Sequence, residues 1–547
     1  MLLYALALLV RLVLVATYPD PAYPDSYYYV DVAKALHDGH GLNVDFVWIF
    51  AEVGGSIPAN PTLPIPSNAH WLPLSSVLQA ASLAIFGDTP IALGIPMALV
   101  GALAAPLTWL IARQAGSRQS VQLGAGLLAA VPAAGTVFMG QPENFAILHT
   151  LVAAILWLTA RGLKGDMKSY VAAGFLVGLA SIARNDGFLL GGAVGLVFVG
   201  DRLQAWRTGR RPRIPLAAAV GCVAMYLIVV TPWWVRQLDT FGSLSPTATS
   251  GRALWIRTMA EWNSITIPAT PDRFFSQGLG PLIQSRVLGL TAAIGNFAIV
   301  ICSVVLVPFV VVGAWLRRRS TDFVPWFVYG FIVFAGAAIL WPVHVPGGAF
   351  IHSSIGLGPH AYVLALEGVA AMVAWIARRR PSWDVRTATP VFVGAVVGLT
   401  MLTAPLFAIG VRASWDAKRQ DRIALSARMN ELGIGADERL LSIDAAGYKY
   451  WTGRPGVVTP DDPLDTIQAV ADAYQTRWLI LERDDIAGAL APVLRGDARP
   501  SWIGPPAFTI AAADGGPPRL ALYPTCTSLS DLRCGGMLGD AATAVAR

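Results

Sequence analysis

Charged residues are scarce in this sequence. Only 14% of its 547 residues are charged, while 55% are apolar, and the mean hydropathy is +0.55. Soluble globular domains carry roughly 25% charged and roughly 45–50% apolar residues. The shortage therefore excludes a protein that is soluble throughout. The net charge of +6 comes from short Arg clusters between apolar runs rather than from one basic face, which argues against a nucleic-acid binder.

Charged residues are distributed unevenly along the chain. Residues 412–547 hold 17 of the 34 acidic residues and 15 of the 40 basic ones, although they make up only a quarter of the length. The first 411 residues are correspondingly apolar. We therefore expect a transmembrane domain at 1–411, followed by a soluble domain at 412–547.

Long apolar runs predict where the chain crosses the membrane, because a span needs about 20 apolar residues. Seven runs are clear candidates, and four shorter ones bring the number of crossings to eleven. The expected spans are 90–112, 121–140, 214–235, 287–316, 323–341, 353–377 and 387–411, with 1–17, 145–160, 169–183 and 187–200 as the shorter ones. The stretch 71–87 is short and contains Ser, Gln and Pro, so we expect it to form an interfacial or re-entrant helix.

The charge of the loops predicts the orientation. Five loops, at 113–118, 161–168, 201–213, 317–322 and 378–386, carry 17 basic and four acidic residues, whereas the loop 18–69 carries six acids, one Lys and no Arg. Basic loops stay in the cytoplasm. We therefore expect a multi-pass protein of the cytoplasmic membrane, either an inner or a plasma membrane, with its N-terminus inside. The first outer loop 18–69, the large outer loop 236–286 and the C-terminal domain would lie outside.

The C-terminal domain has the pattern of an α/β fold. Short apolar runs at 439–445, 476–482 and 519–523 are typical of buried strands, and amphipathic stretches at 415–432 and 464–475 are typical of helices. Their alternation favours a small, largely parallel sheet. Cys526 and Cys534 lie in this domain, where oxidation is permitted, and we expect them to form a disulfide, with two free thiols as the alternative.

The first outer loop contains the most informative acid. Asp25 follows the first span directly, among aromatic residues, and precedes a short helix that ends in Asp-Gly. A carboxylate at the membrane surface beside apolar rings suits a general base. The alternative is an acid that caps the helix or faces solvent.

Charged and titratable residues also occur inside the expected spans. Arg11 and Glu367 are costly in lipid and should face the protein interior. His360 and Glu367 lie seven residues apart on one helical face, which predicts a buried hydrogen-bonded pair. His149 is expected to pack rather than react.

Several motifs, in this order, resemble the GT-C class of membrane glycosyltransferases. The likeness is closer to the branch that contains the protein O-mannosyltransferases and the aminoarabinose transferase of lipid A. The motifs are Asp25 after the first span, His70-Trp-Leu-Pro, Gln141-Pro-Glu143-Asn, Gly178-Leu-Ala-Ser-Ile-Ala-Arg184-Asn-Asp-Gly, Thr231-Pro-Trp-Trp-Val-Arg236, Phe241-Gly and Ser250-Gly-Arg252. They cover about residues 1–360. The chain departs from the family where Ser26 replaces a Glu, where His70-Trp-Leu-Pro replaces Lys-Pro-Pro and where Glu143 replaces an Asp.

The resemblance implies a GT-C-like fold and transfer of a sugar from a polyprenyl-phosphate donor to an acceptor hydroxyl of a glycan, lipid or protein on the outer face. Asp25 would be the general base of an in-line, inverting attack, and Glu143 the second acid. Cations would stabilise the leaving phosphate, and the candidates are His70, Arg184, Arg236, Arg252, His344 and His352. Arg184 and Arg236 could instead extend from helix ends toward the membrane surface. His344 and His352 could be solvated loop residues.

The sequence requires no cofactor, although Asp25 and Glu143 could ligate a divalent metal. A nucleotide-sugar donor is not expected, because the soluble domain lacks a Gly-x-Gly-x-x-Gly loop and lies on the outer side. Two other functions compete with transfer. A transporter or flippase of lipid-linked sugars would show an inverted repeat of hydropathy, which is not evident. A non-enzymatic anchor for the C-terminal domain would leave the acidic outer loop without a purpose.

Overall fold

The computed structural model describes residues 1–244, 249–380 and 382–526. The chain forms two compact units. Unit 1 comprises Met1–Pro21, Trp71–Arg236 and Leu279–Arg412, and unit 2 comprises Ala22–His70, Gln237–Gly278 and Ala413–Arg547. The expected division at 411/412 is close to one of these boundaries. Unit 2 nevertheless also includes most of the first outer loop and most of the large outer loop, which the sequence assigned to the transmembrane domain.

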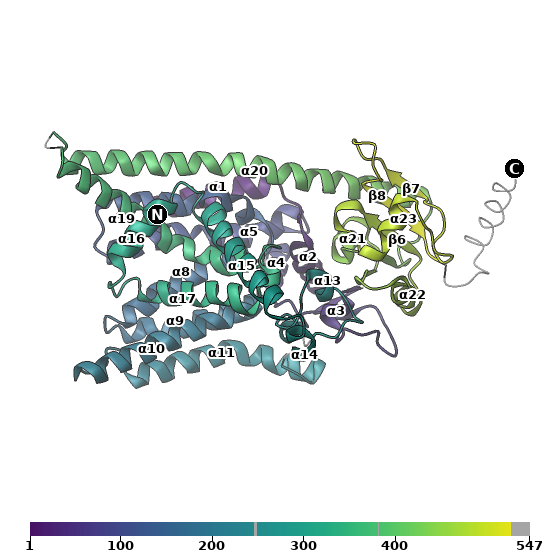
Figure 1. Ribbon diagram of the computed structural model, residues 1–547, viewed down its shortest axis with the longest axis horizontal. Helices are drawn as coiled ribbons and strands as arrows, with labels where there is room; N and C mark the ends of the chain where they lie inside the picture. Colours follow the sequence, from purple (N-terminus) through teal and green to yellow (C-terminus); the bar gives the residue numbers. More distant parts are fainter. Residues whose placement is uncertain (245–248, 381, 527–547) are drawn as a thin grey trace. The chain divides into compact units, whose positions relative to one another are not determined.

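Unit 1 is helical, and Figure 1 shows its long helices lying side by side. Its elements are α1 (Leu2–Thr17), α4 (Leu74–Phe86), α5 (Pro90–Ala102), α6 (Ala104–Gln114), α7 (Gln119–Ala130), η1 (Ala133–Gly140), α8 (Phe145–Gly162), α9 (Met167–Ala183), η2 (Asn185–Gly187), α10 (Phe188–Thr208), α11 (Leu216–Phe241), α15 (Leu279–Asn296), η3 (Phe297–Ile301), α16 (Val307–Arg317), α17 (Val324–Ala335), η4 (Gly336–Leu340), η5 (Pro342–His344), α18 (Ala349–Ser354), η6 (Ile355–Leu357), α19 (Gly358–Ala377) and α20 (Val385–Glu431). Of these, α11 and α20 continue into unit 2.

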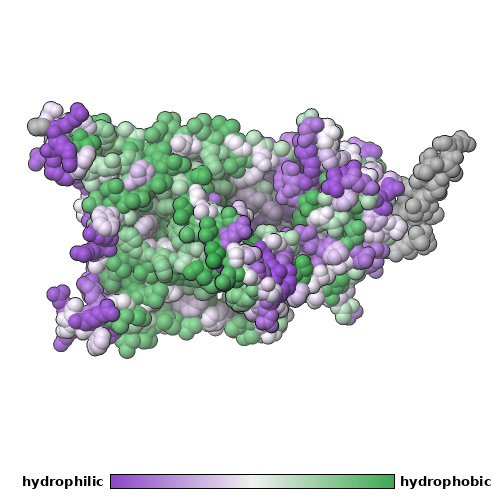
Figure 2. Space-filling model, viewed as in Figure 1, coloured by the Kyte–Doolittle hydropathy of each residue, from purple (hydrophilic) through white to green (hydrophobic). Residues whose placement is uncertain are grey.

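Seven helices within the described ranges are long and apolar enough to cross a membrane, or eight if the bent pair α7–η1 counts as one span. Shorter apolar helices include α1, α9, α16 and the run Val324–Leu340. The chain is therefore a multi-pass membrane protein, and the count of eleven crossings stays a prediction. Figure 2 shows apolar residues over most of the visible face of unit 1, as a lipid-facing surface requires.

Three predicted spans differ from the helices that form. The span 121–140 bends by 44° where α7 ends, because Pro132 lacks an N–H and restricts the residue before it. The span 287–316 is interrupted at Ser303 and Val304, whose φ angles of 46° and 62° are left-handed. The span 387–411 and the helix 415–432 are one continuous helix, α20, so the predicted domain boundary lies inside a helix.

Buried charges in unit 1 have specific partners. Arg11 is fully buried, and its guanidinium donates to the carbonyls of Ala129 and Ala130 at 3.1 and 3.0 Å, where α7 ends. The predicted pairing of His360 with Glu367 is wrong. Glu367 instead forms an ion pair with Arg317 at 2.9 Å, because the C-terminal end of α16 reaches it from the neighbouring helix. His360 packs edge-on against Phe323.

Unit 2 contains a six-stranded sheet in the order β2-β5-β4-β6-β8-β7. In this sheet β2 pairs in parallel with β5, β5 with β4, and β4 with β6. Strand β8 pairs antiparallel with β6 and β7. The strands and helices of this part are β2 (Phe46–Val47), β4 (Leu440–Ser442), α21 (Ala445–Thr452), β5 (Gly456–Val458), α22 (Leu464–Ala473), β6 (Trp478–Glu482), η7 (Arg483–Asp485), η8 (Gly488–Leu490), α23 (Ala491–Arg495), β7 (Phe508–Ile510) and β8 (Leu520–Pro524). Strands β4, β6 and β8 lie in the three stretches that the sequence marked as strands.

The edge strand of this sheet comes from the first outer loop. β2 pairs with β5, although about 400 residues separate them, in the register Phe46 with Gly456 and Val47 with Val457. The remaining elements of the outer loops are α2 (Pro24–His37), β1 (Asn43–Val44), α3 (Ile49–Glu52), β3 (Ile65–Pro66), α12 (Thr249–Arg252), α13 (Met259–Trp262) and α14 (Pro271–Phe275). Three distant chain segments thus build one unit.

Candidate functional site

Asp25 is the second residue of α2, in unit 2, and its side chain is half-buried. Pro24 opens the helix, because its ring fixes φ and its missing N–H needs no partner at this position. An acidic residue in the first turn of a helix is also favoured by the helix dipole. The position of Asp25 therefore has a structural basis in addition to the proposed chemical one.

Ser26, which stands where the resembled family has a Glu, has a structural role. Its hydroxyl accepts from the backbone N–H groups of Ala22 and Tyr23 at 3.0 and 3.1 Å and donates to the Tyr23 carbonyl at 2.7 Å. These contacts satisfy backbone groups that a helix N-terminus leaves free. The departure from the family motif thus secures the start of the helix that carries Asp25.

α2 also holds the segment that carries His70. The Tyr28 hydroxyl accepts from the backbone N–H of Asn68 at 2.7 Å, and the Gln237 side chain donates to the Asn68 carbonyl at 3.1 Å. Two residues later the His70 ring lies 6.1 Å from that of Trp262 on α13. His70 therefore lies in unit 2, where α2 contacts the residues before it and α13 contacts its ring.

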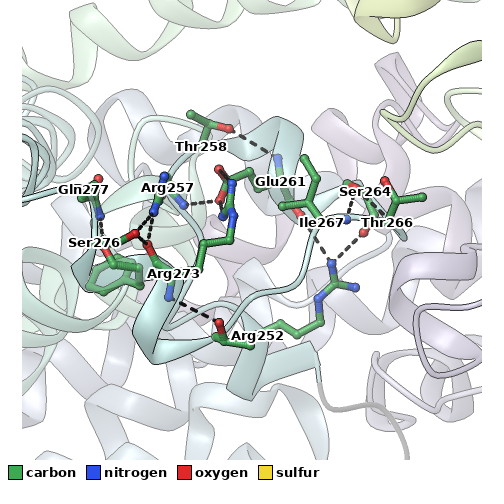
Figure 3. Close-up of polar contacts among 12 residues, drawn as sticks. Arg252, Arg257, Thr258, Glu261, Ser264, Thr266, Ile267, Arg273, Ser276 and Gln277 are labelled. Carbon is green, nitrogen blue, oxygen red and sulfur yellow. Dashed lines mark hydrogen bonds and ion pairs between the residues drawn. The ribbon is translucent and has the colours of Figure 1, made fainter.

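Arg252 donates to the protein backbone within unit 2. Its Nη2 donates to the Ser264 carbonyl at 2.6 Å and lies 3.4 Å from the Glu261 carbonyl, as Figure 3 shows. Burial lowers the pKa of this guanidinium. A side chain with carbonyl partners organises its own loop, so the structure gives Arg252 a role that the sequence analysis did not expect.

The same loop is closed by a second set of contacts. Arg273 binds both carboxylate oxygens of Glu261, at 2.7 and 2.8 Å, and Arg257 donates its backbone N–H to the same carboxylate (Figure 3). The buried carboxylate of Asp462 accepts from the Ser264 hydroxyl at 2.6 Å and the Ile265 N–H at 2.7 Å. The large outer loop is therefore anchored to the C-terminal segment.

Glu143 is fully buried in unit 1, between η1 and α8. One carboxylate oxygen accepts from the Asn144 N–H at 2.6 Å, and the other lies 3.3 Å from Nδ1 of His352. The His352 ring stacks on Phe145, with centroids 4.0 Å apart and planes inclined by 12°. The structure thus brings together two residues that the sequence analysis named separately.

Neighbouring helices fix the backbone around Glu143. The Gln79 side chain on α4 donates to the Pro142 carbonyl at 2.9 Å, and the Asn144 amide donates to the Ala183 carbonyl at the end of α9, also at 2.9 Å. An acid held this rigidly is oriented before any substrate arrives.

Arg184 joins this group through an acid that the sequence analysis missed. Its Nε lies 3.0 Å from Asp186, and Asp186 also accepts from the hydroxyl of Ser353, the neighbour of His352. Tyr329 donates to the Ser353 carbonyl at 2.9 Å. The Arg-Asn-Asp-Gly sequence could have identified Asp186, but nothing in the sequence indicates Ser353.

Arg236 and His344 lie elsewhere in unit 1. The Arg236 guanidinium lies 5.1 Å from the ring centroid of Trp233, one turn earlier on α11. His344 ends η5 and is half-buried.

No group of three or more His, Cys, Asp or Glu side chains within the described ranges could hold a metal ion. Whether Asp25 and Glu143 use a metal stays a prediction. The expected Cys526–Cys534 bridge also stays a prediction, because residue 534 lies outside the described part of the chain.

Residues 68–235 match the family described as dolichyl-phosphate-mannose-protein mannosyltransferase. This stretch includes His70, Glu143 and Arg184 and ends one residue before Arg236. No curated protein matches the chain by sequence.

Solved membrane glycosyltransferases have a similar structure. The crystal structure of ArnT from Cupriavidus metallidurans bound to undecaprenyl phosphate is similar with a TM-score of 0.52 and 15% identity, covering 96% of this chain and 98% of that chain. The apo state of ArnT gives a TM-score of 0.51 with the same identity and coverage. A structure of the arabinofuranosyltransferase AftD from Mycobacteria has a TM-score of 0.44 and 13% identity, covering 96% of this chain and 40% of that chain. The likeness to ArnT shows a shared fold over almost the full length of both chains.

Proposed function

We propose that this chain, which shares the fold of ArnT and matches the mannosyltransferase family over residues 68–235, transfers a sugar from a polyprenyl-phosphate carrier to an acceptor hydroxyl on the outer face of the cytoplasmic membrane. The observation that carries the proposal is the buried, prearranged polar group of unit 1. In it, Glu143, His352 and Arg184 come from three different helical segments of a lipid-facing bundle. Buried titratable groups of this kind mark functional sites in membrane proteins.

Asp25 is the general base in this proposal. The acceptor hydroxyl gives its proton to Asp25, its oxygen forms the new bond to the anomeric carbon, and the bond from that carbon to the carrier phosphate breaks. In-line displacement inverts the anomeric centre. The support for this role is the place of Asp25 at the N-terminus of α2, where its backbone is fixed by the Ser26 cap.

The leaving phosphate gains negative charge, which positively charged groups and hydrogen-bond donors stabilise. We assign this role to Arg184, Arg236 and His352, with His70 and His344 as further candidates. Arg252 has backbone carbonyls as partners and is not included. Glu143 lies 3.3 Å from His352, and its role in the proposal is to orient that ring. ArnT, which shares the fold, was crystallised with undecaprenyl phosphate, a lipid monophosphate, and this supports the class of donor.

The basic loops, whose charge is the basis of the proposed orientation, contain Arg side chains that lie over aromatic rings. In each of the five basic loops, an Arg at or near the end of the preceding helix lies over an aromatic ring about one turn earlier. The pairs are Arg113 over Trp109, Arg161 over Trp157, Arg202 over Phe198, Arg318 over Trp315 and Arg379 over Trp375. Basic residues mark the cytoplasmic side of a membrane, whereas aromatic rings occur at both interfaces, so the proposed orientation rests on the basic residues. Cysteines at Thr208 and at the exposed Asp484 should therefore react from opposite sides of the membrane.

The test supplies purified protein in lipid with matched sugars carried either on polyprenyl phosphate or on a nucleotide. We expect product only from the lipid carrier, with and without a chelator. Arg236→Ala should raise KM for the donor roughly tenfold or more, because it removes a charge-assisted contact. Arg202→Ala, which also removes an Arg stacked on a ring, is the control and should leave KM unchanged. Transfer from the nucleotide form alone would overturn the proposal.

A further inference from the structure

Three consecutive residues of α21, in the C-terminal segment, contact the outer segment that carries Asp25. The Trp451 indole N–H donates to the Tyr27 hydroxyl at 2.8 Å, and the ring of Tyr450 lies 5.5 Å from that of Tyr27. Lys449 forms an ion pair with Asp45 at 2.6 Å. Tyr27 is two residues from Asp25 on the same helix, so these contacts fix the first turns of α2.

α21 is itself rigidly held. Asp444 caps its N-terminus by accepting from the Gly447 N–H at 3.0 Å, and the same carboxylate pairs with the buried Arg422 at 2.7 Å. Arg422 also pairs with Glu482 on β6 at 3.1 Å. Its guanidinium lies over the rings of both Tyr27 and Tyr448, at 5.2 and 4.9 Å. One buried cation thus connects α20, α21, the sheet and α2.

The Tyr27 hydroxyl is suited to positioning rather than to proton transfer. Burial raises its pKa to about 12, with Arg422 acting in the opposite direction, so the group stays protonated at neutral pH. The Tyr27 hydroxyl accepts from the indole of Trp451, which can only donate a hydrogen bond, and it also interacts with the Arg422 side chain. In this contact Trp451 is therefore the donor and Tyr27 the acceptor. A change in the position of α21 would thus change the orientation of α2.

We propose that α21 is a positioning element for the base-bearing helix, and that Trp451, through Tyr27, sets the orientation of Asp25. The inference rests on the proposed role of Asp25 as general base. It assigns a purpose to the C-terminal segment, which is to complete the sheet with β2 and to hold α2. Misplacement of a catalytic group by about 1 Å can reduce a rate on the order of 10²-fold.

The test compares three variants of the full-length protein in lipid. Tyr27→Phe removes only a hydroxyl, Trp451→Phe removes the indole N–H together with part of the ring, and the double variant makes both changes. Each should lower kcat roughly tenfold with KM for donor and acceptor within about twofold. The double variant should be no slower than the slower single variant, because all three remove one contact. The control is Tyr474→Phe, which removes a buried hydroxyl without a hydrogen-bond partner among the described residues.

A second measurement covers variants that fold poorly. Hydrogen exchange of the α2 amides in 24–37 should be faster in Trp451→Phe than in Tyr474→Phe. Unchanged kcat in Tyr27→Phe and Trp451→Phe, or unchanged exchange in α2, would overturn the inference. If Asp25→Asn keeps normal turnover, the proposed function fails instead, so the two failures are distinguishable.

Discussion

The two units differ in how they hold their buried charges. In unit 1 the fully buried Arg11 donates to backbone carbonyls at the end of α7, and Glu143 accepts from the backbone of Asn144. In unit 2 the buried Arg422 pairs with two carboxylates, Asp444 and Glu482. A helix in lipid satisfies its own backbone, so free carbonyls occur only where helices end or bend, and buried charges gather there. In unit 2, Arg422 on α20 instead joins the carboxylate that caps α21 to the carboxylate at the end of β6.

This difference predicts different consequences of substitution. Polar residues around the buried acid of unit 1 should affect turnover more than stability. Buried charges of unit 2 should affect stability and, through α2, the candidate base.

Asp25→Asn should reduce kcat by roughly 10²- to 10⁴-fold, because removal of a general base has this effect. The amide is nearly isosteric, so the thermal unfolding temperature should not change. Single-turnover assays with a lipid-linked sugar measure the loss. Asp38→Asn changes an acid at the other end of α2 and is the matched control. Turnover near that of the control would show that Asp25 is not the base.

Arg422→Met should destabilise the protein by about 3–5 kcal/mol, because it leaves Asp444 and Glu482 buried without their cation. Denaturation in detergent, followed by the fluorescence of Trp451 and its neighbours, measures the change. Arg519→Met removes an exposed ion pair with Asp421 from the same unit and should cost about 0–1 kcal/mol. Equal effects of the two substitutions would contradict the view that Arg422 holds unit 2 together.

Glu143→Gln should lower kcat roughly 10- to 100-fold and leave the unfolding temperature nearly unchanged, because the amide keeps the shape of the side chain but replaces the carboxylate that lies 3.3 Å from Nδ1 of His352. The measurement is turnover with a fixed excess of donor. Gln141→Glu, in the same turn, would introduce a charge without that pairing and serves for comparison. A large loss of stability without loss of turnover would reverse the contrast drawn between the two units.

The last prediction concerns the dependence of stability on pH. Burial raises the pKa of Glu52 in unit 2 to about 7, above its usual 4.5. The folded state therefore binds a proton more tightly than the unfolded state, and stability falls as pH rises from about 4.5 through about 7. Unfolding temperatures measured between pH 5 and pH 8 should show this decrease, and Glu52→Gln should reduce it. An identical pH profile in the variant would assign the decrease to other groups.

The sequence by itself determined the class of this protein. The shortage of charge, the length of the apolar runs and the clustering of basic residues in five loops follow from the cost of placing charge in lipid, which acts on every segment independently. The order of the motifs from Asp25 to Arg252 added a resemblance to the GT-C class. Glu143 and Arg184 could be named because each belongs to a local motif.

Only the tertiary structure decided which residues meet. Helical spacing placed His360 and Glu367 on one face, yet Arg317 reaches Glu367 from another helix. Strand β2, two residues long, carries too little pattern to be predicted, and it forms because β5 offers an unpaired edge. The contact of Trp451 with Tyr27 likewise joins residues 424 positions apart. Such contacts depend on how segments pack, and no local property of the chain specifies them.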